Sequence, residues 1–286
     1  MLIRLCAYYN STMKNITAKQ IFASLGIILA VAAITFISVQ FYRSLREYQV
    51  QTLLFRAQEA EQQGNNQEAL TLRETIEKDD PQNISNLLAI ATLHFMLDDY
   101  NQAQIKAGQV LSYDENADAF LLLGKVYLQT GDIQQARETL SSAVNISQDN
   151  DDANFLLALI QFADDKDQEA EDLLRKAASV QNVSREITEF STAWEAIKVE
   201  QNPYYRDSLL AFQFLNFNYP YLALHVLPAV TENEPNYRDG HYLLAASYFE
   251  TNQYEKAQES IQKALEIDPE HQPSKDLRAI IEKAQQ

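Results

Sequence analysis

The sequence predicts an all-α protein in which a stack of helix-turn-helix units, an α-solenoid, follows one N-terminal transmembrane helix. Three observations lead to this prediction. The 286 residues include only 6 Gly and 7 Pro, too few turn formers for an all-β sandwich or barrel. Small residues recur about every 34 positions, which is a repeat period typical of helical solenoids. An uncharged and mostly apolar run, long enough for a membrane-spanning helix, lies near the N-terminus.

The composition excludes several classes of protein. The 23 basic and 40 acidic residues give a net charge of −17, the wrong sign for neutralising phosphates, so nucleic acid is not an expected partner. Cys6 is the single cysteine, which excludes an intrachain disulfide and any metal site built from several cysteines. With 46% hydrophobic and 22% charged residues, the chain is close to globular averages and should fold over most of its length.

Residues 21–42 form the apolar run, and as a helix they extend roughly 33 Å, enough to cross a hydrocarbon core of ~30 Å. A cleaved signal peptide is the alternative, because Ala30-Val31-Ala32 resembles a cleavage site. Cleavage there would leave an apolar new N-terminus, and the uncut run exceeds a usual signal-peptide core. A buried core helix would need a larger domain around it. We therefore expect an uncleaved anchor that contacts the lipid bilayer.

The charges beside this span predict its orientation. Basic residues flank it equally: Arg4, Lys14 and Lys19 before it, and Arg43, Arg46 and Arg56 after it. The short basic tail 1–20 contains no acid, whereas the chain after residue 42 carries 20 basic and 40 acidic residues. We expect a single-pass membrane protein with its N-terminus in the cytoplasm and its repeat domain outside, on the periplasmic side in a bacterium.

The repeat is marked by six regularly spaced alanines: Ala69, Ala103, Ala136, Ala170, Ala223 and Ala257. Twelve positions before each one stands another small residue: Ala57, Ala91, Gly124, Ala158, Ala211 and Ala245. Polar turn clusters such as Gly131-Asp132 lie between the two small residues of five of the units. Apolar residues follow the alanines at helical spacing, so each unit is predicted to be two helices joined by a tight turn.

Two units in particular resemble the tetratricopeptide repeat family. Their residues are Leu123-Gly124-x-x-Tyr127…Ala136…Leu140…Ala143 and Leu244-Ala245-x-x-Tyr248…Ala257…Ile261…Ala264…Pro269. The resemblance implies about six repeats, at 50–83, 84–116, 117–150, 151–184, 204–237 and 238–271. The chain departs from the family pattern at the closing proline, which stands only at Pro81, Pro235 and Pro269, and at Arg56 and Arg73 of the first unit.

The domain organisation follows from these boundaries. Residues 43–184 hold repeats 1–4 with a connecting stalk, 204–271 hold repeats 5 and 6, and 272–286 form a capping helix. No Gly or Pro lies between Gly26 and Gly64, so the membrane helix is expected to continue into the first repeat as a stiff helical stalk. Pro228 is expected to kink the second helix of repeat 5.

The segment 185–203 interrupts the period and forms an amphipathic inserted helix, whose apolar stripe contains Ile187, Phe190, Trp194 and Ile197. Two interpretations stay open for it. It is a decayed repeat, or it marks a break between two arms. At such a break the helix either wedges between the arms or lies across the binding groove, covering part of Phe155, Leu159, Phe162 and Phe212. If it lies on the groove, Trp194 belongs to a gating helix that a partner would displace.

The resemblance implies a binding groove on the concave face, which the first helix of each repeat lines. The candidate groove residues are Phe95, Leu128, Phe155, Leu159, Phe162, Phe212, Leu215, Tyr242 and Phe249. Aromatic residues at such positions can also pack on neighbouring helices, and this alternative stays open. Lys125 stands alone, without the Lys and Asn set with which some relatives hold a peptide's terminal carboxylate, so that mode is disfavoured.

We find no pattern for catalysis or for a cofactor. The four histidines lack metal-ligand spacing, and phosphate-binding loops and nucleophile elbows are absent from the sequence. Acidic pairs such as Asp98-Asp99 occupy predicted turns, where acids cap helices. No enzyme, cofactor or metal is expected. The sequence predicts a membrane-anchored protein-binding scaffold or chaperone-like adaptor. The alternative is a receptor whose repeats face the cytosol and deliver proteins to a membrane machine, since an acidic, apolar groove would suit basic amphipathic segments.

Overall fold

Helices account for all regular secondary structure in residues 18–285, the part of the chain that the structure describes. The structure is a computed structural model, and these residues contain fourteen helices and no strand. This confirms the predicted all-α fold class. The chain divides into two compact units, with the boundary between Asn65 and Asn66.

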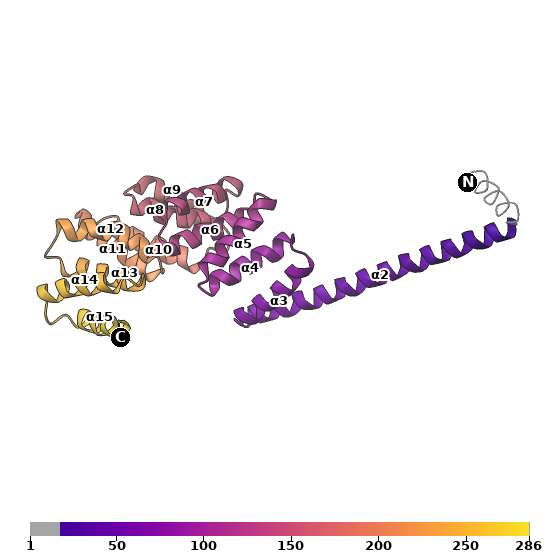
Figure 1. Ribbon diagram of the computed structural model, residues 1–286. Coiled ribbons are helices and arrows are strands. Elements are labelled where there is room, and N and C mark those ends of the chain that lie inside the picture. The colour runs from indigo at the N-terminus through magenta and orange to yellow at the C-terminus, as the bar shows by residue number, and fades with distance from the viewer. Residues whose placement is uncertain (1–17, 286) are drawn as a thin grey trace, which may run out of the picture. The chain divides into compact units, whose positions relative to one another are not determined.

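The first unit contains one long helix, α2 (Ala18–Gln62), of 45 residues (Figure 1). It runs without a break through the predicted span 21–42 and on to Gln62, as the lack of Gly and Pro after Gly26 predicts. Within it, Leu25–Gln62 is long and apolar enough to cross a membrane, and an 18-residue window of mean hydropathy 2.1 is wholly unburied. Cys6 and residues 1–17 of the basic tail lie outside the described residues.

The second unit begins with α3 (Asn66–Asp79) and continues as successive helix pairs (Figure 1). Five pairs correspond to repeats 2–6: α4 (Ile84–Met96) with α5 (Tyr100–Tyr113), α6 (Ala117–Thr130) with α7 (Ile133–Ile146), α8 (Asp151–Ala163) with α9 (Asp167–Ala177), α11 (Pro203–Asn216) with α12 (Pro220–Asn233), and α13 (Arg238–Glu250) with α14 (Tyr254–Ile267). The predicted kink in α12 is not tested, but that helix continues through Pro228 to Asn233. The last helix, α15 (Gln272–Ala284), packs on α14, where the capping helix was predicted.

A residue with positive φ recurs once per repeat, in the turn between the first and second helix. These residues are Gly64 (75°), Asp98 (58°), Gly131 (85°), Asp165 (59°), Asn218 (62°) and Asn252 (58°). Each stands five positions before one of the six alanines, so the turns and the alanines share one period. The left-handed conformation favours Gly, Asn and Asp, so the turn residues follow from the backbone geometry that the repeat requires.

Asparagine side chains begin four of the first helices. Asn83, Asn116 and Asn150 each accept a hydrogen bond from the backbone N–H three residues on, at 2.9–3.0 Å. Asn202 accepts from the N–H groups of Tyr204 and Tyr205, at 2.9 and 3.2 Å. Because the first N–H groups of a helix have no partner within it, each cap fixes where a first helix starts.

The small residues allow the paired helices to approach closely. Ala103, Ala136, Ala170 and Ala257 are all fully buried. At Gly124, in α6, a β-carbon would lie 2.5 Å from the side chain of Leu140, in α7. Only glycine fits there without displacing Leu140, which explains why the small residue of this repeat is glycine rather than alanine.

The inserted segment 185–203 forms one helix, α10 (Arg185–Ile197), which begins at its N-cap Ser184. Its predicted apolar stripe, Ile187, Phe190, Trp194 and Ile197, is at most 4% exposed. Arg206, in the following α11, forms ion pairs with two aspartates at the turn between α8 and α9. Its guanidinium group is 2.7 Å from Asp165 and 2.8 Å from Asp167.

Repeat 5 folds back against repeats 3 and 4. In a regular solenoid each repeat contacts only its neighbours, but here α12 of repeat 5 contacts α6 of repeat 3 as well as α8 of repeat 4. The side-chain amide of Gln129, at the end of α6, donates to the backbone oxygen of Asn218 at 2.8 Å. A β-carbon at Gly131 would lie 2.5 Å from the ring of Tyr221. One continuous buried core therefore runs from Leu128 to Leu244.

Candidate functional site

Four of the predicted groove residues lie in this core instead of on an open face. Leu128, Phe155, Leu159 and Phe162 are at most 2% exposed, because α10 and α12 cover the first helices of repeats 3 and 4. In the structure the chain itself thus covers these four side chains, and their role in a binding groove stays a prediction. The repeat period predicts that the four side chains share one face of the solenoid. They are buried because α10 and α12, which follow later in the chain, pack over that face.

Aromatic rings make the contact between this face and α10. Phe162 lies 4.1 Å from Trp194 and 5.7 Å from Phe190, measured between ring centroids. Phe155 lies 5.6 Å from Phe190 in an edge-to-face arrangement. The indole N–H of Trp194 donates to a carboxylate oxygen of Glu171, in α9, at 3.0 Å. Contacts within the chain thus hold both the apolar ring system and the polar N–H group of Trp194.

A polar cluster closes the same face beside the aromatic rings. Lys125 in α6 pairs with Asp152 in α8 at 2.6 Å. Glu186, near the start of α10, hydrogen-bonds the hydroxyl of Tyr219, the residue before α12. Burial raises the pKa of Glu186, as does the nearby carboxylate of Asp152. Burial likewise raises the pKa of Tyr219, so its hydroxyl stays protonated and can donate. The ammonium group of Lys125 is thus already paired within the chain, with Asp152.

Three further groove candidates are half-buried. Phe95 packs on Tyr100 at 5.6 Å, and Phe249 packs on Tyr254 at 5.8 Å, each ring lying across the turn from its partner. Leu215 packs against the main core. These contacts agree with the alternative in which such side chains serve the packing of the repeat.

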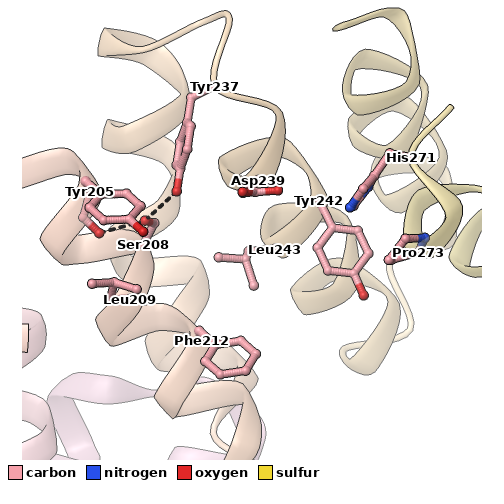
Figure 2. Close-up of a pocket in the computed structure, with 10 residues that line it drawn as sticks. All are labelled: Tyr205, Ser208, Leu209, Phe212, Tyr237, Asp239, Tyr242, Leu243, His271 and Pro273. Atoms are coloured by element: carbon pink, nitrogen blue, oxygen red, sulfur yellow. Dashed lines mark hydrogen bonds between the residues drawn. The ribbon is translucent and has the colours of Figure 1, made fainter. Parts of the chain in front are cut away.

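The two remaining candidates, Phe212 and Tyr242, lie together at a pocket of about 290 Å³ on the first helices of repeats 5 and 6. Its lining comes from α11, from α13 with the residue before it, and from the start of α15: Tyr205, Ser208, Leu209, Phe212, Tyr237, Asp239, Tyr242, Leu243, His271 and Pro273. Figure 2 shows the α11 side chains facing Tyr242, with His271 and Pro273 beyond it. Tyr205 is 43% exposed and Phe212 is 47% exposed.

Hydrogen bonds hold the wall of this pocket that Tyr205, Ser208 and Tyr237 form. Ser208 Oγ donates to the backbone oxygen of Tyr205 at 2.7 Å, so the Tyr237 hydroxyl, 3.1 Å away, is the donor to Ser208. Burial raises the pKa of Tyr237, which keeps that proton in place at neutral pH. The rings of Tyr205 and Tyr237 lie 6.0 Å apart in an edge-to-face arrangement. The two tyrosines are therefore fixed relative to each other.

The charge at this pocket is acidic. Asp239 lines it, and the neighbouring Arg238 donates to Asp239 at 2.8 Å and to Asp268 at 3.0 Å. Hydrogen bonding to Asp239 raises the pKa of Arg238, so its guanidinium group stays charged and is shared between two carboxylates. The described residues that line the pocket include neither lysine nor arginine. The pocket thus combines apolar surface with one carboxylate.

A second pocket, of about 180 Å³, shares the Tyr205–Tyr237 wall. It is lined by Asn202, Tyr204, Tyr205, Glu234 and Tyr237. Glu234 is exposed, and in the described chain its carboxylate makes no ion pair. The two pockets and their common wall form one surface, which we call the tyrosine site.

Most residues of this site were not predicted from the sequence. Ser208, Leu209 and Leu243 lie within first helices, whereas others precede or begin a helix and share the repeat period. Tyr205, Asp239 and Pro273 occupy equivalent positions of successive units, as do Tyr237 and His271. The 34-residue spacing of these positions is the sequence signal that predicts them.

The histidines contact partners within the protein. His94 lies 3.3 Å from Asp99, and His225 lies 3.3 Å from Asp164. His241 Nε2 is 2.9 Å from the backbone oxygen of Pro235, and His271 Nδ1 is 2.7 Å from Ser274 Oγ. Within the described residues, no group of three or more His, Cys, Asp or Glu side chains could hold a metal ion.

Comparison with family models supports the repeat assignment. The tetratricopeptide repeat model matches residues 238–271, the same residues as the sixth predicted repeat. The repeats are tetratricopeptide-like. The model of the anaphase-promoting complex, cyclosome, subunit 3 matches residues 99–177, which include α5 to α9. None of the curated proteins compared by sequence matches the chain.

Several solved structures are similar to this tetratricopeptide-like chain. A tetratricopeptide repeat protein from Parabacteroides merdae is 14% identical, with a TM-score of 0.46 over 82% of this chain and 99% of that one. MamA is 15% identical, with a TM-score of 0.39 over 74% of this chain and 94% of that one. YrrB, described as a TPR protein with an unusual peptide-binding site, is 19% identical, with a TM-score of 0.36 over 72% and 97%.

Proposed function

We propose that this protein is a membrane-anchored, non-catalytic scaffold or chaperone-like adaptor that binds a protein or peptide segment at the tyrosine site. One observation carries the proposal. The first helices of repeats 3 and 4 are covered by the chain itself, while those of repeats 5 and 6 leave Tyr205 and Phe212 nearly half exposed beside a pocket. Exposed aromatic side chains at a concave pocket are typical of protein-binding surfaces.

The membrane helix supports the second half of the proposal. Leu25–Gln62 contains an apolar stretch long enough to span a bilayer, and Leu29, Ile37 and Phe41 on it are more than 60% exposed. Exposed side chains of this kind are stable in lipid and costly in water. We infer that residues 21–42 insert into the bilayer, with the basic tail 1–20 in the cytoplasm and the repeats outside it.

The binding half is tested by photocrosslinking in intact cells that make the full chain, followed by mass spectrometry of what is captured. Phe212→Ala should reduce capture by about tenfold, because truncating a central aromatic anchor costs on the order of 1–2 kcal/mol of binding. Met96→Ala is the matched control, since Met96 is 58% exposed on α4, which contributes nothing to the lining of the site. Equal capture by wild type and Phe212→Ala would contradict the proposed site.

The orientation is tested with protease added to spheroplasts. Digestion of the repeat domain together with retention of the membrane helix is expected. Protection of the repeats would place them in the cytosol and favour the alternative receptor that delivers proteins to a membrane machine. A mature N-terminus near Ala33 would show a cleaved signal peptide instead of an anchor.

A further inference from the structure

The tyrosine site consists of two unlike pockets on either side of one aromatic wall. The larger pocket, about 290 Å³, has the apolar side chains Leu209, Phe212 and Leu243 in its lining. The smaller pocket, about 180 Å³, has Tyr204 and Glu234. Sites for small molecules usually measure ~300–1,000 Å³, so the larger pocket lies at the lower end of that range, and the smaller one is better matched to a single side chain of a bound polypeptide.

The smaller pocket has the groups that bind a cation. Tyrosine rings attract Lys and Arg side chains through their quadrupole, and the Glu234 carboxylate adds a negative charge beside them. Within the described part of the chain, no lysine or arginine lines either pocket. The guanidinium group of Arg238 is held between Asp239 and Asp268, so it does not leave an unbalanced positive charge near the site.

The larger pocket has the groups that bind an apolar side chain. Phe212 and Tyr205 expose nearly half of their surface at its edge, and burying that surface under a guest would be favourable. The polar atoms of its Tyr205–Tyr237 wall are already occupied, because the Tyr237 hydroxyl donates to Ser208 and Ser208 donates to the Tyr205 backbone oxygen. A guest here therefore needs to supply few hydrogen bonds.

We infer that the tyrosine site selects a polypeptide segment that carries a bulky apolar side chain near a lysine or arginine. The apolar side chain enters the larger pocket, and the cation enters the smaller pocket between the tyrosine rings and Glu234. The net charge of −17 disfavours acidic segments at long range. This inference rests on the proposed protein-binding function and specifies the partner of the same site.

The probes are short synthetic Ser/Gly peptides labelled with a fluorophore. One set carries Phe and Arg separated by different numbers of residues, and matched sets replace Arg by Glu or replace Phe by Ser. Binding to the full chain in detergent micelles is measured by fluorescence anisotropy. We expect the Phe and Arg set to bind most tightly at one preferred spacing, and each replacement to weaken binding.

Two variants assign the charge to a residue. Glu234→Gln should weaken binding of the Phe and Arg peptide roughly two- to fivefold and leave the Glu peptide no weaker, as expected for an exposed ion pair with an aromatic contribution. Glu234→Lys should reverse the preference between the Arg and Glu peptides. Glu232→Gln is the matched control, because Glu232 is also exposed but lies outside both linings.

The inference is overturned if the Glu peptides bind as tightly as the Arg peptides, or if Glu234→Gln leaves the discrimination unchanged. The same holds if no peptide binds while photocrosslinked capture still depends on Phe212, which would keep the proposed function and reject this partner class. If no peptide binds and photocrosslinked capture is also independent of Phe212, the proposed function is rejected as well.

Discussion

At the residue scale, the contacts of Trp194 bear on the interpretations of the inserted helix. It is 2% exposed, its ring packs on Phe162, and its N–H is bound to Glu171. A tryptophan so placed belongs to the folding core that joins repeats 3–5. Its side chain thus has a structural role in the conformation described here.

Trp194→Ala is therefore expected to lower the free energy of unfolding by about 3–5 kcal/mol, through the lost burial and the cavity left behind. Urea denaturation of the full chain in detergent, followed by circular dichroism, measures this change. Trp194 fluorescence should be blue-shifted in the folded protein. Unchanged stability together with tighter partner binding would instead favour a gating helix that competes with the partner.

Glu186 predicts a pH dependence of stability. Burial and Asp152 raise its pKa in the folded chain above the unfolded value. As the pH rises from about 4, Glu186 loses its proton more easily in the unfolded chain than in the folded one. The Glu186 side chain therefore lowers the free energy of unfolding increasingly as the pH rises. Glu186→Gln removes that charge and keeps an acceptor for the Tyr219 hydroxyl.

Glu186→Gln should therefore raise the free energy of unfolding above that of wild type only slightly near pH 4, and by more at pH 7. Denaturation at the two pH values measures it. Glu189→Gln is the control on the same helix, since Glu189 is exposed and pairs with Arg185 in a surface ion pair. A constant difference between wild type and Glu186→Gln would contradict the assignment.

At the element scale, the left-handed turn residues determine how each helix pair closes. Asn218 (φ 62°) should tolerate glycine, whereas Asn218→Ala should cost roughly 1 kcal/mol, because alanine disfavours this conformation. Gly131→Ala should cost more, since its β-carbon also meets the Tyr221 ring at 2.5 Å. Thermal denaturation of the three variants tests the order, and an equal loss for both alanine variants would contradict it.

The sequence predicted the elements because the repeat depends on local physics. Turn residues, asparagine caps and close-packed small residues such as Gly124 each act within one unit, so their period is visible in the chain. The contact of α12 with α6 and α8 joins residues far apart in the chain, as Gln129 and Asn218 illustrate. No period encodes such a contact, so the sequence left open whether the inserted helix would lie over Phe155 and Phe162.

At the scale of the second unit, the core is unevenly distributed. The main buried cluster includes residues of α7, α8, α10 and α12, whereas smaller clusters join α4, α5 and α6 and join α13, α14 and α15. Regions with few buried contacts open at lower free energy. The ends of the solenoid should therefore open before its middle.

Hydrogen exchange followed by mass spectrometry should show the slowest amide exchange in α8 and α10 and much faster exchange in α15, where only Ser274 and Ile281 are buried. The full chain in detergent is the sample. Uniform protection from α4 to α15 would contradict a central core and indicate that the unit opens only as a whole.

The sequence by itself determined the class of this protein: an apolar N-terminal helix and tetratricopeptide-like pairs that end in a capping helix. These features follow from hydrophobic length, helix period and turn chemistry, which act between residues near one another in the chain. The tertiary structure decided which first helices stay open. Burying the aromatic stripe of α10 required a partner surface, and the fold supplied the face of α8 with Phe155 and Phe162. The exposed aromatic surface was thereby left to repeats 5 and 6, at the tyrosine site.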